Sequence, residues 1–79
     1  MKSVHSPTYK ATIEVLKSAR RRAGLTQQAL ADRLGRPQSF VAKFERGERR
    51  IDVGEFIEIA EAIEASPVRL FAAITRTRA

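Results

Sequence analysis

The chain contains no cysteine, no tryptophan and only one histidine among its 79 residues. Without cysteine, the protein can form no disulfide bond, no thiolate metal site and no cysteine nucleophile. His5 has no second histidine with which it could bind zinc, so we expect neither a metal site nor a cofactor. A chain without cysteine also fits a reducing compartment, and we expect a cytoplasmic protein.

Long apolar runs are missing as well. No segment approaches the length that would cross a membrane, and the N-terminus MKSVHSPTYK lacks the apolar core of a signal peptide. The sequence has no glycine-rich phosphate loop, no nucleophile elbow and no metal-binding motif. The acids that recur at every third position from Asp52 to Glu64 fit the solvated face of an amphipathic helix. We therefore expect a protein that is not an enzyme and does not bind a membrane.

The charge of the chain is basic and unevenly distributed. The net charge is +6, but residues 1–50 carry twelve Lys or Arg and four Asp or Glu, whereas residues 51–79 carry three and five. One half of a single small domain therefore holds the positive charge, which suggests a face that meets a polyanion such as nucleic acid. The solvated surface of an ordinary basic protein would show the same pattern.

Start and stop signals divide the chain into five short helices with no strand between them. The start signals are capping side chains or an early proline: Ser6-Pro7, Thr26, Pro37, Asp52 (with Glu55 placed for a capping box) and Ser66-Pro67. The stop signals are Gly24, Gly35 and Gly47. We predict an all-α, compact five-helix domain over residues 7–75, with helices near 7–23, 26–34, 37–46, 52–64 and 67–75. Residues 1–6 are expected to form a flexible arm and residues 76–79 a frayed tail.

The segment from residue 27 to residue 44 has the spacing of a helix-turn-helix. If Gln27 is counted as the first position, Ala31 is the fifth, Gly35 the ninth, Val41 the fifteenth and Phe44 the eighteenth. A small residue at the fifth position lets the next helix cross closely, and glycine at the ninth allows a positive φ. Such a corner would hold the third helix at a steep angle, so that its N-terminal end can enter a DNA major groove.

Two segments, LTQQALADRLGRPQSFVAKFERGERR and IDVGEFIEIAEAIEASPVRLF, resemble the Cro/cI-like (XRE-type) helix-turn-helix regulators. The resemblance extends from Leu16 to Phe71 and implies a lambda-repressor-like fold. It also implies a transcription regulator, a repressor or autoregulator, that binds double-stranded DNA as a homodimer on a near-palindromic operator. Arg36 departs from the family pattern, because many members carry an apolar residue there, and we expect it to face solvent or phosphate.

By this resemblance, residues 37–46 form the recognition helix, whose outward side chains contact bases. Glutamine can bond adenine in a bidentate way, lysine favours the acceptors of guanine, serine can serve several bases, and a small apolar side chain can touch a thymine methyl. The expected base-contacting residues are Pro37, Gln38, Ser39, Ala42 and Lys43. On a generic helix the same residues would be an ordinary polar surface.

The resemblance also implies residues that hold the DNA backbone and the fold. The expected phosphate contacts are Gln27, Arg36, Arg46, Arg49 and Arg50, with Arg21 and Arg22 as secondary candidates. In the family, an arginine at the position of Arg20 pairs with the glutamate at the position of Glu45. We therefore expect a partly buried structural ion pair between these two residues.

The fifth helix is the expected dimer interface. Leu70 and Phe71 match core positions of the family and should face inward. The apolar strip for a partner chain would then consist of Val68, Ala72, Ala73 and Ile74. Alternatively, Ile74 closes the core of a monomer.

Two other functions would fit a basic domain of this size. The protein could be an antitoxin or anti-activator whose main role is to bind a partner protein. It could also bind RNA or DNA without sequence preference, although the polar residues of the recognition helix argue against this.

Overall fold

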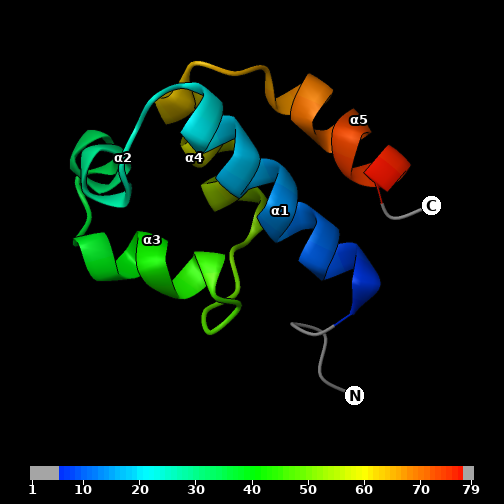
Figure 1. Cartoon of the computed structure of the whole chain (residues 1–79), viewed down its shortest axis with the longest axis horizontal. Helices are drawn as coiled ribbons and strands as arrows, with labels where there is room; N and C mark the ends of the chain where they lie inside the picture. The colour runs from blue at the N-terminus through cyan, green and yellow to red at the C-terminus, as the bar shows by residue number, and fades with distance from the viewer. Residues whose placement is uncertain (1–5, 78–79) are drawn as a thin grey trace.

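The computed structural model describes residues 6–77, which fold into five α-helices and no strand (Figure 1). The helices are α1 Pro7–Arg22, α2 Gln27–Leu34, α3 Gln38–Glu45, α4 Val53–Ile63 and α5 Pro67–Thr77. The all-α five-helix prediction is confirmed, with boundaries that agree to within two residues. The largest difference is at the end of α5, where Arg76 and Thr77 are helical rather than part of a tail. The rest of the expected arm and tail, residues 1–5 and 78–79, lies outside the described residues.

The longest helix, α1, forms the spine of the domain. It contacts α3, α4 and α5, while α2 packs against α3 and α4. In Figure 1, α5 runs beside α1 on one side, and α2 and α3 lie together on the other. The paired helices α2 and α3 are therefore presented at one end of the molecule.

Helices this short depend on capping and packing for their stability. The hydroxyl oxygens of Ser6, Thr26 and Ser66 each accept a hydrogen bond from the backbone N–H three residues later, at 3.0, 3.0 and 3.2 Å. The predicted capping box is present: Asp52 Oδ1 accepts from the Glu55 N–H at 2.7 Å, and Glu55 Oε1 accepts from the Asp52 N–H at 3.0 Å. The local start signals in the sequence thus act as expected.

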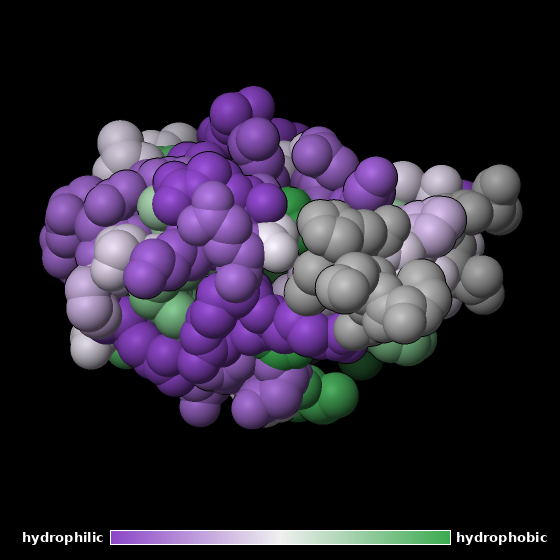
Figure 2. Space-filling model, turned by 90° about the horizontal axis from the view of Figure 1, so that it is seen from below, coloured by the Kyte–Doolittle hydropathy of each residue, from purple (hydrophilic) through white to green (hydrophobic). Residues whose placement is uncertain are grey.

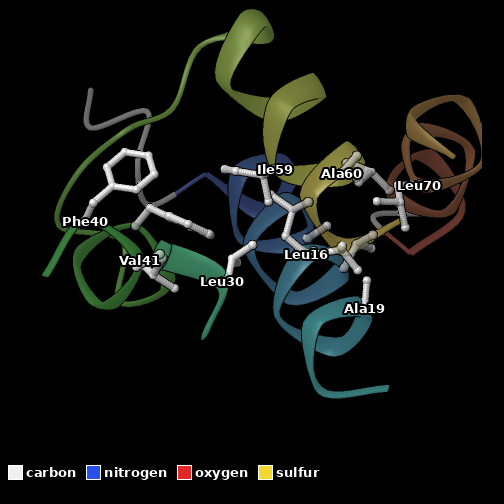
Figure 3. Packing of buried hydrophobic residues seen from close by; sticks show 14 residues of the cluster. Leu16, Ala19, Leu30, Phe40, Val41, Ile59, Ala60 and Leu70 are labelled. Carbon is white, nitrogen blue, oxygen red and sulfur yellow. The ribbon is translucent and has the colours of Figure 1, made fainter. Parts of the chain in front are cut away.

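Leu16 lies at the centre of the core, where α1 meets side chains from α2, α4 and α5 (Figure 3). The other large side chains that are fully buried are Leu30, Val41, Phe44 and Ile59. On α3, the rings of Phe40 and Phe44 pack edge to face, with 5.5 Å between their centroids. The inner side of α3 is thereby fixed to the rest of the domain.

The helix α5 places its apolar residues differently from the prediction. Leu70 and Ile74, four residues apart on one face, are buried in the core, and Ala73 packs against it. Phe71, which was expected to face inward, is 61% exposed. A helix turns by about 100° per residue, so Phe71 lies toward the edge of the buried face, about 100° around the helix from Leu70 and about 60° from Ile74. The prediction that Ile74 belongs to a dimer strip is therefore wrong, because Ile74 lies in the core, as the alternative for a monomer also required.

Candidate nucleic-acid interface

The corner between α2 and α3 is built as the spacing of the sequence predicted. Gly35 ends α2 in a left-handed conformation with φ of 68°, and the Arg36 N–H donates back to the Ala31 carbonyl at 3.0 Å. Ala31 is fully buried, which allows α3 to cross close to α2. Pro37 then takes an extended conformation as the N-cap of α3. In Figure 1, α2 is seen almost end-on while α3 lies across the view, so the two helices cross steeply.

The helix α3 has one buried side and one exposed side. Gln38, Ser39 and Lys43 are exposed, in agreement with their predicted outward positions. Ala42 is only 7% exposed, so the prediction that it points outward is wrong. The surface of α3 that can contact a ligand is therefore formed by the three polar residues and by Pro37 at its start.

A buried ion pair connects α1 to the end of α3. Arg20 Nε donates to Glu45 Oε2 at 2.7 Å, and Arg20 Nη2 donates to Glu45 Oε1 at 2.9 Å. Arg20 Nη1 also donates to the Leu25 carbonyl at 2.7 Å. The expected pair is thus present, as a bidentate contact between two buried side chains. It fixes the C-terminal end of α3 against α1.

Two glutamines extend this ion pair to the surface. Gln27 Nε2 donates to Glu45 Oε1 at 2.9 Å, and Gln38 Nε2 donates to Gln27 Oε1 at 2.8 Å. The side-chain amide of Gln27, an expected phosphate contact, is therefore engaged within the protein. Gln38 keeps its carbonyl oxygen and one amide hydrogen for another partner. Both glutamines were expected at the interface from the sequence, but the bond between them was not predicted.

Three of the arginines expected at phosphates lie in the loop after α3: Arg46, Arg49 and Arg50. Arg46 Nε and Nη2 donate to Glu48 Oε2 and Oε1 at 3.0 and 3.1 Å, on the surface. This hydrogen bonding, with the attraction of the two charges, raises the pKa of Arg46 and lowers the pKa of Glu48. The Arg50 guanidinium carbon lies 5.1 Å from the centroid of the Tyr9 ring. The Tyr9 hydroxyl accepts a hydrogen bond from the Ile51 N–H at 3.0 Å, which ties this loop to α1.

Two of the expected arginines, Arg36 and Arg49, share a carboxylate that was not predicted from the sequence. Arg36 Nη2 donates to Glu55 Oε2 at 3.2 Å, and Arg49 Nη1 donates to Glu55 Oε1 at 2.8 Å. Their guanidinium carbons lie 4.2 and 4.9 Å from the centroid of the Phe40 ring. Arg36 therefore does not simply face solvent or phosphate, because a carboxylate from α4 binds it. Glu55, expected among the solvated acids of α4, is largely buried beneath the two arginines.

The environment of Glu55 strongly favours its charged form. The hydrogen bond from Arg49 is the main cause that lowers the pKa of Glu55 from 4.5 to about 2. Burial opposes this shift, while the hydrogen bond from the Asp52 N–H, the charge of Arg49 and the hydrogen bond from Arg36 add to it. The same hydrogen bond raises the pKa of Arg49. The carboxylate is therefore ionised at neutral pH.

Hydrophilic side chains cover most of the molecular face on which α3 lies (Figure 2). Lys43 on α3 and Arg46 and Arg50 in the loop after it are exposed cations, and they lie close in the sequence to the exposed hydrogen-bonding groups of α3, which suits a polyanion. Among residues 6–77, no group of acidic or histidine side chains is arranged to hold a metal ion. Within the same range, no helix is long and apolar enough to cross a membrane.

Comparisons with known proteins agree with this geometry. The model of the family described as Helix-turn-helix matches residues 16–70. The structure of an XRE-family like protein from Pseudomonas syringae pv. tomato str. DC3000 is 45% identical, with a TM-score of 0.87 over 95% of this chain and 92% of that one. The restriction-modification controller protein C.AhdI from Aeromonas hydrophila is 31% identical, with a TM-score of 0.70 over 77% of this chain and 92% of that one.

A third structure has the same fold at lower identity. It is the restriction-modification controller protein C.Esp1396I as a tetramer in complex with its natural 35 base-pair operator. It is 23% identical, with a TM-score of 0.85 over 94% of this chain and 97% of that one. No curated protein sequence matches the chain.

The segment matched by the family model contains both helices of the corner, the exposed residues of α3 and the buried ion pair. The resemblance expected from the sequence is therefore shown by a family match over most of the chain and by a relative of nearly the same length. The chain belongs to the XRE-type helix-turn-helix family of DNA-binding transcription regulators.

Proposed function

We propose that the protein reads a specific sequence of duplex DNA with the exposed side of α3, and that it regulates transcription from that site as a repressor or autoregulator. The observation that carries the proposal is the division of α3 into a polar exposed side and a buried side that is locked in the core. A helix that is already fixed can enter the major groove without being ordered first. Less conformational entropy is then lost when DNA binds.

Each exposed side chain of α3 fits a base edge. The Gln38 amide can donate to N7 and accept from N6 of adenine, and Lys43 can donate to O6 and N7 of guanine. Ser39 can bond several bases, and Pro37 can touch a thymine methyl. Ala42 is left out of this set because it is buried. A good bidentate contact discriminates against the wrong base by about 1–3 kcal/mol.

Positive side chains around α3 would set its position by contacting phosphates, which add affinity but carry no sequence information. The candidate side chains are Arg36, Arg46, Arg49 and Arg50. Gln27 would contribute its backbone N–H at the first turn of α2, because its side-chain amide is already bonded within the protein.

We propose further that the protein acts as a homodimer, because one recognition helix reads only a few base pairs. Among residues 6–77, the exposed large apolar side chains all belong to α4 and α5: Val53, Ile57, Val68 and Phe71. Val53 and Phe71 line one largely apolar groove between α1, α4 and α5. On α5, Val68, Phe71 and half-buried Ala72 share a face that a second copy could cover.

Such a dimer would place two copies of α3 about 34 Å apart on a near-palindromic operator. The operator complex of C.Esp1396I, a protein of the same fold, is a tetramer, which supports an oligomer here. We place the protein in the cytoplasm, where the operator of such a regulator lies. We also propose that it is not an enzyme, since its family consists of transcription regulators.

Selection from a randomised duplex library, followed by sequencing, tests this function. At about 150 mM salt, long-range attraction between exposed charges is largely screened and sequence-specific contacts can be distinguished. We expect an enriched inverted repeat whose half-site centres are about one helical turn apart. Gln38→Ala should change the preferred bases, whereas Gln28→Ala, at an exposed glutamine of α2, should leave the preference unchanged. A library without any enrichment, bound only at low salt, would contradict the proposal.

A further inference from the structure

Four side chains from four different segments meet beside α3. Arg36 lies in the turn before the helix, Phe40 within it, Arg49 in the loop after it and Glu55 in the first turn of α4. Both guanidiniums lie over the Phe40 ring, and both bond the same carboxylate. The contacts therefore bring two positive charges, distant in the sequence, to one place at the edge of the expected DNA-binding helix.

This cluster holds one more positive charge than negative charge. Both oxygens of Glu55 are occupied: Oε1 accepts from Arg49 and from the Asp52 N–H, and Oε2 accepts from Arg36. The Glu55 side chain is only 12% exposed, so it has little surface left for another partner. The Arg36 and Arg49 side chains are 36% and 42% exposed. Solvent can thus reach the two cations, but hardly the anion that holds them.

The remaining donors of the cluster suit a phosphate. A guanidinium carries five N–H donors, and Glu55 accepts from one terminal nitrogen of each arginine. Arg49 Nη1 also donates to the Arg50 carbonyl at 2.7 Å, which leaves the Nε and Nη2 donors of Arg49 and the Nε and Nη1 donors of Arg36 for another partner. Two like charges beside one ring repel each other, and Glu55 compensates only one of them. A phosphodiester carries a single negative charge and several acceptor oxygens, so one such group would complete both the charge and the hydrogen bonding.

We propose that Glu55 is a positioning residue for DNA, because it holds Arg36 and Arg49 together as one site for a backbone phosphate next to α3. The inference rests on the proposed DNA binding. It adds that the acidic residue Glu55 arranges the two cations. The guanidinium carbons lie 4.2 and 4.9 Å from the centroid of the Phe40 ring, where the ring attracts a cation. The planar fork of a guanidinium can bond Glu55 and a phosphate at the same time, which a lysine ammonium could not reproduce. The phosphate site would fix α3 in the groove from the side of α4.

The proposal predicts that neutralising Glu55 weakens DNA binding, whereas charge repulsion alone would predict tighter binding. Removal of a negative charge near DNA ordinarily strengthens binding, because phosphates are repelled less. In Glu55→Gln, the neutral side chain can still accept from the Asp52 N–H and maintain the capping box. It loses the charge-assisted hydrogen bonds that hold the two guanidiniums. We therefore expect weaker DNA binding from a less negative protein.

The test compares the wild type, Glu55→Gln and Glu58→Gln on the operator duplex obtained by selection, by fluorescence anisotropy over a range of salt concentrations. Glu58 is exposed on the same helix and bonds neither arginine, so Glu58→Gln is the matched change of charge. We expect Glu55→Gln to bind about tenfold more weakly at physiological salt. Binding should also depend less steeply on salt. The negative slope of log K against log salt should become shallower by about one, as for one lost phosphate contact. Glu58→Gln should bind as tightly as the wild type or more tightly.

Arg36→Lys and Arg49→Lys provide a second measurement that does not depend on how well Glu55→Gln folds. Both variants keep the positive charge, so DNA affinity should not change if only charge matters. If the proposed site exists, both variants should bind DNA more weakly, because the planar guanidinium fork is lost. Equal or tighter operator binding by Glu55→Gln, with unchanged binding by both lysine variants, would overturn the proposal while leaving DNA recognition intact. A wild-type protein that selects no duplex would instead overturn the proposed function itself, and this inference with it.

Discussion

Gln38 Nε2 donates a 2.8 Å hydrogen bond to Gln27 Oε1, and Gln27 is itself bonded to Glu45 in the buried ion pair. The side-chain amide of Gln27 thus connects the buried ion pair to Gln38, the first residue of α3. A glutamine on a surface loses rotamer freedom when it binds a partner. Here the bond to Gln27 restricts Gln38 before a base is present, so less entropy remains to be lost on DNA.

Gln27→Ala should weaken operator binding, mainly at the base pair that Gln38 contacts. A neutral hydrogen bond of this kind contributes about 1 kcal/mol, which corresponds to roughly a fivefold loss of affinity. Glu45 keeps both bonds from Arg20, so the stability of the fold should change little. A double-mutant cycle with Gln38→Ala measures the coupling on the selected duplex. Strictly additive losses would show that the two amides act independently.

Arg20→Ala should destabilise the fold before it affects any DNA contact. Removal of one partner leaves the Glu45 carboxylate buried without its main counter-charge, which costs about 3–5 kcal/mol in comparable buried pairs. Urea unfolding of the variant and the wild type measures the difference. Arg46→Ala is the control, because the pair of Arg46 and Glu48 is exposed and its loss should change stability little. Equal unfolding midpoints for Arg20→Ala and the wild type would refute this prediction.

The fold could be predicted from the sequence where local signals determine it. Ser6, Thr26 and Asp52 cap the helices that they precede, because capping depends only on residues a few positions apart. Gly35 takes the positive φ that the spacing of the corner required. The pair of Arg20 and Glu45, separated by 25 positions, could be predicted only through the resemblance to a family.

The errors have equally specific causes. The apolar residues of α5 run without interruption from Leu70 to Ile74, so the pattern could not decide which of them face the core. The shared carboxylate was missed because Glu55 lies on α4, 19 positions after Arg36, which precedes α3. Its spacing within α4 placed it among solvated acids, and only the tertiary fold brings it beneath two arginines. Contacts across a turn or loop leave no periodic signal in a single sequence.

Phe71→Ser should abolish the proposed dimer and leave the monomer folded. The Phe71 ring is mostly exposed, so the substitution removes apolar surface from the partner-binding face and creates no cavity in the core. Sedimentation equilibrium measures the association, and urea unfolding measures the stability. Ile74→Ala should show the reverse pattern, with a fold less stable by about 2–5 kcal/mol because a buried side chain is truncated. A wild-type protein that stays monomeric on its operator would refute the dimer and direct attention to a partner protein on this face.

Glu64→Gly should stabilise the domain. Glu64 ends α4 in a left-handed conformation with φ of 67°, which costs a residue with a side chain about 1–2 kcal/mol. Glycine avoids this cost but loses more backbone entropy on folding, so the net gain should be about 0.5–1 kcal/mol. The ion pair to Arg33 that is lost, at 4.0 Å between exposed groups, contributes little. Thermal unfolding should show a higher midpoint, and Glu61→Gly, within the same helix, should show a lower one.

Acid should remove the stabilising contribution of Glu55. Its pKa is about 2 in the folded protein, compared with 4.5 ordinarily, chiefly because Arg49 donates a hydrogen bond to it. Between these two values the unfolded chain binds a proton at Glu55 and the folded chain does not, so acidification favours unfolding. The contribution is fully present above about pH 4.5 and is lost as the pH falls toward 2.

Urea unfolding of the wild type and Glu55→Gln between pH 6 and pH 2.5, about the window set by these pKa values, measures this contribution. The glutamine cannot titrate, so the advantage of the wild type should shrink steadily as the pH is lowered. Glu58→Gln, which removes an exposed carboxylate from the same helix, should follow the wild type throughout. A difference between the wild type and Glu55→Gln that stays constant with pH would mean that the two arginines do not hold the carboxylate in its charged form. In that case Arg36 and Arg49 would also lack the anchor on which their common phosphate site depends.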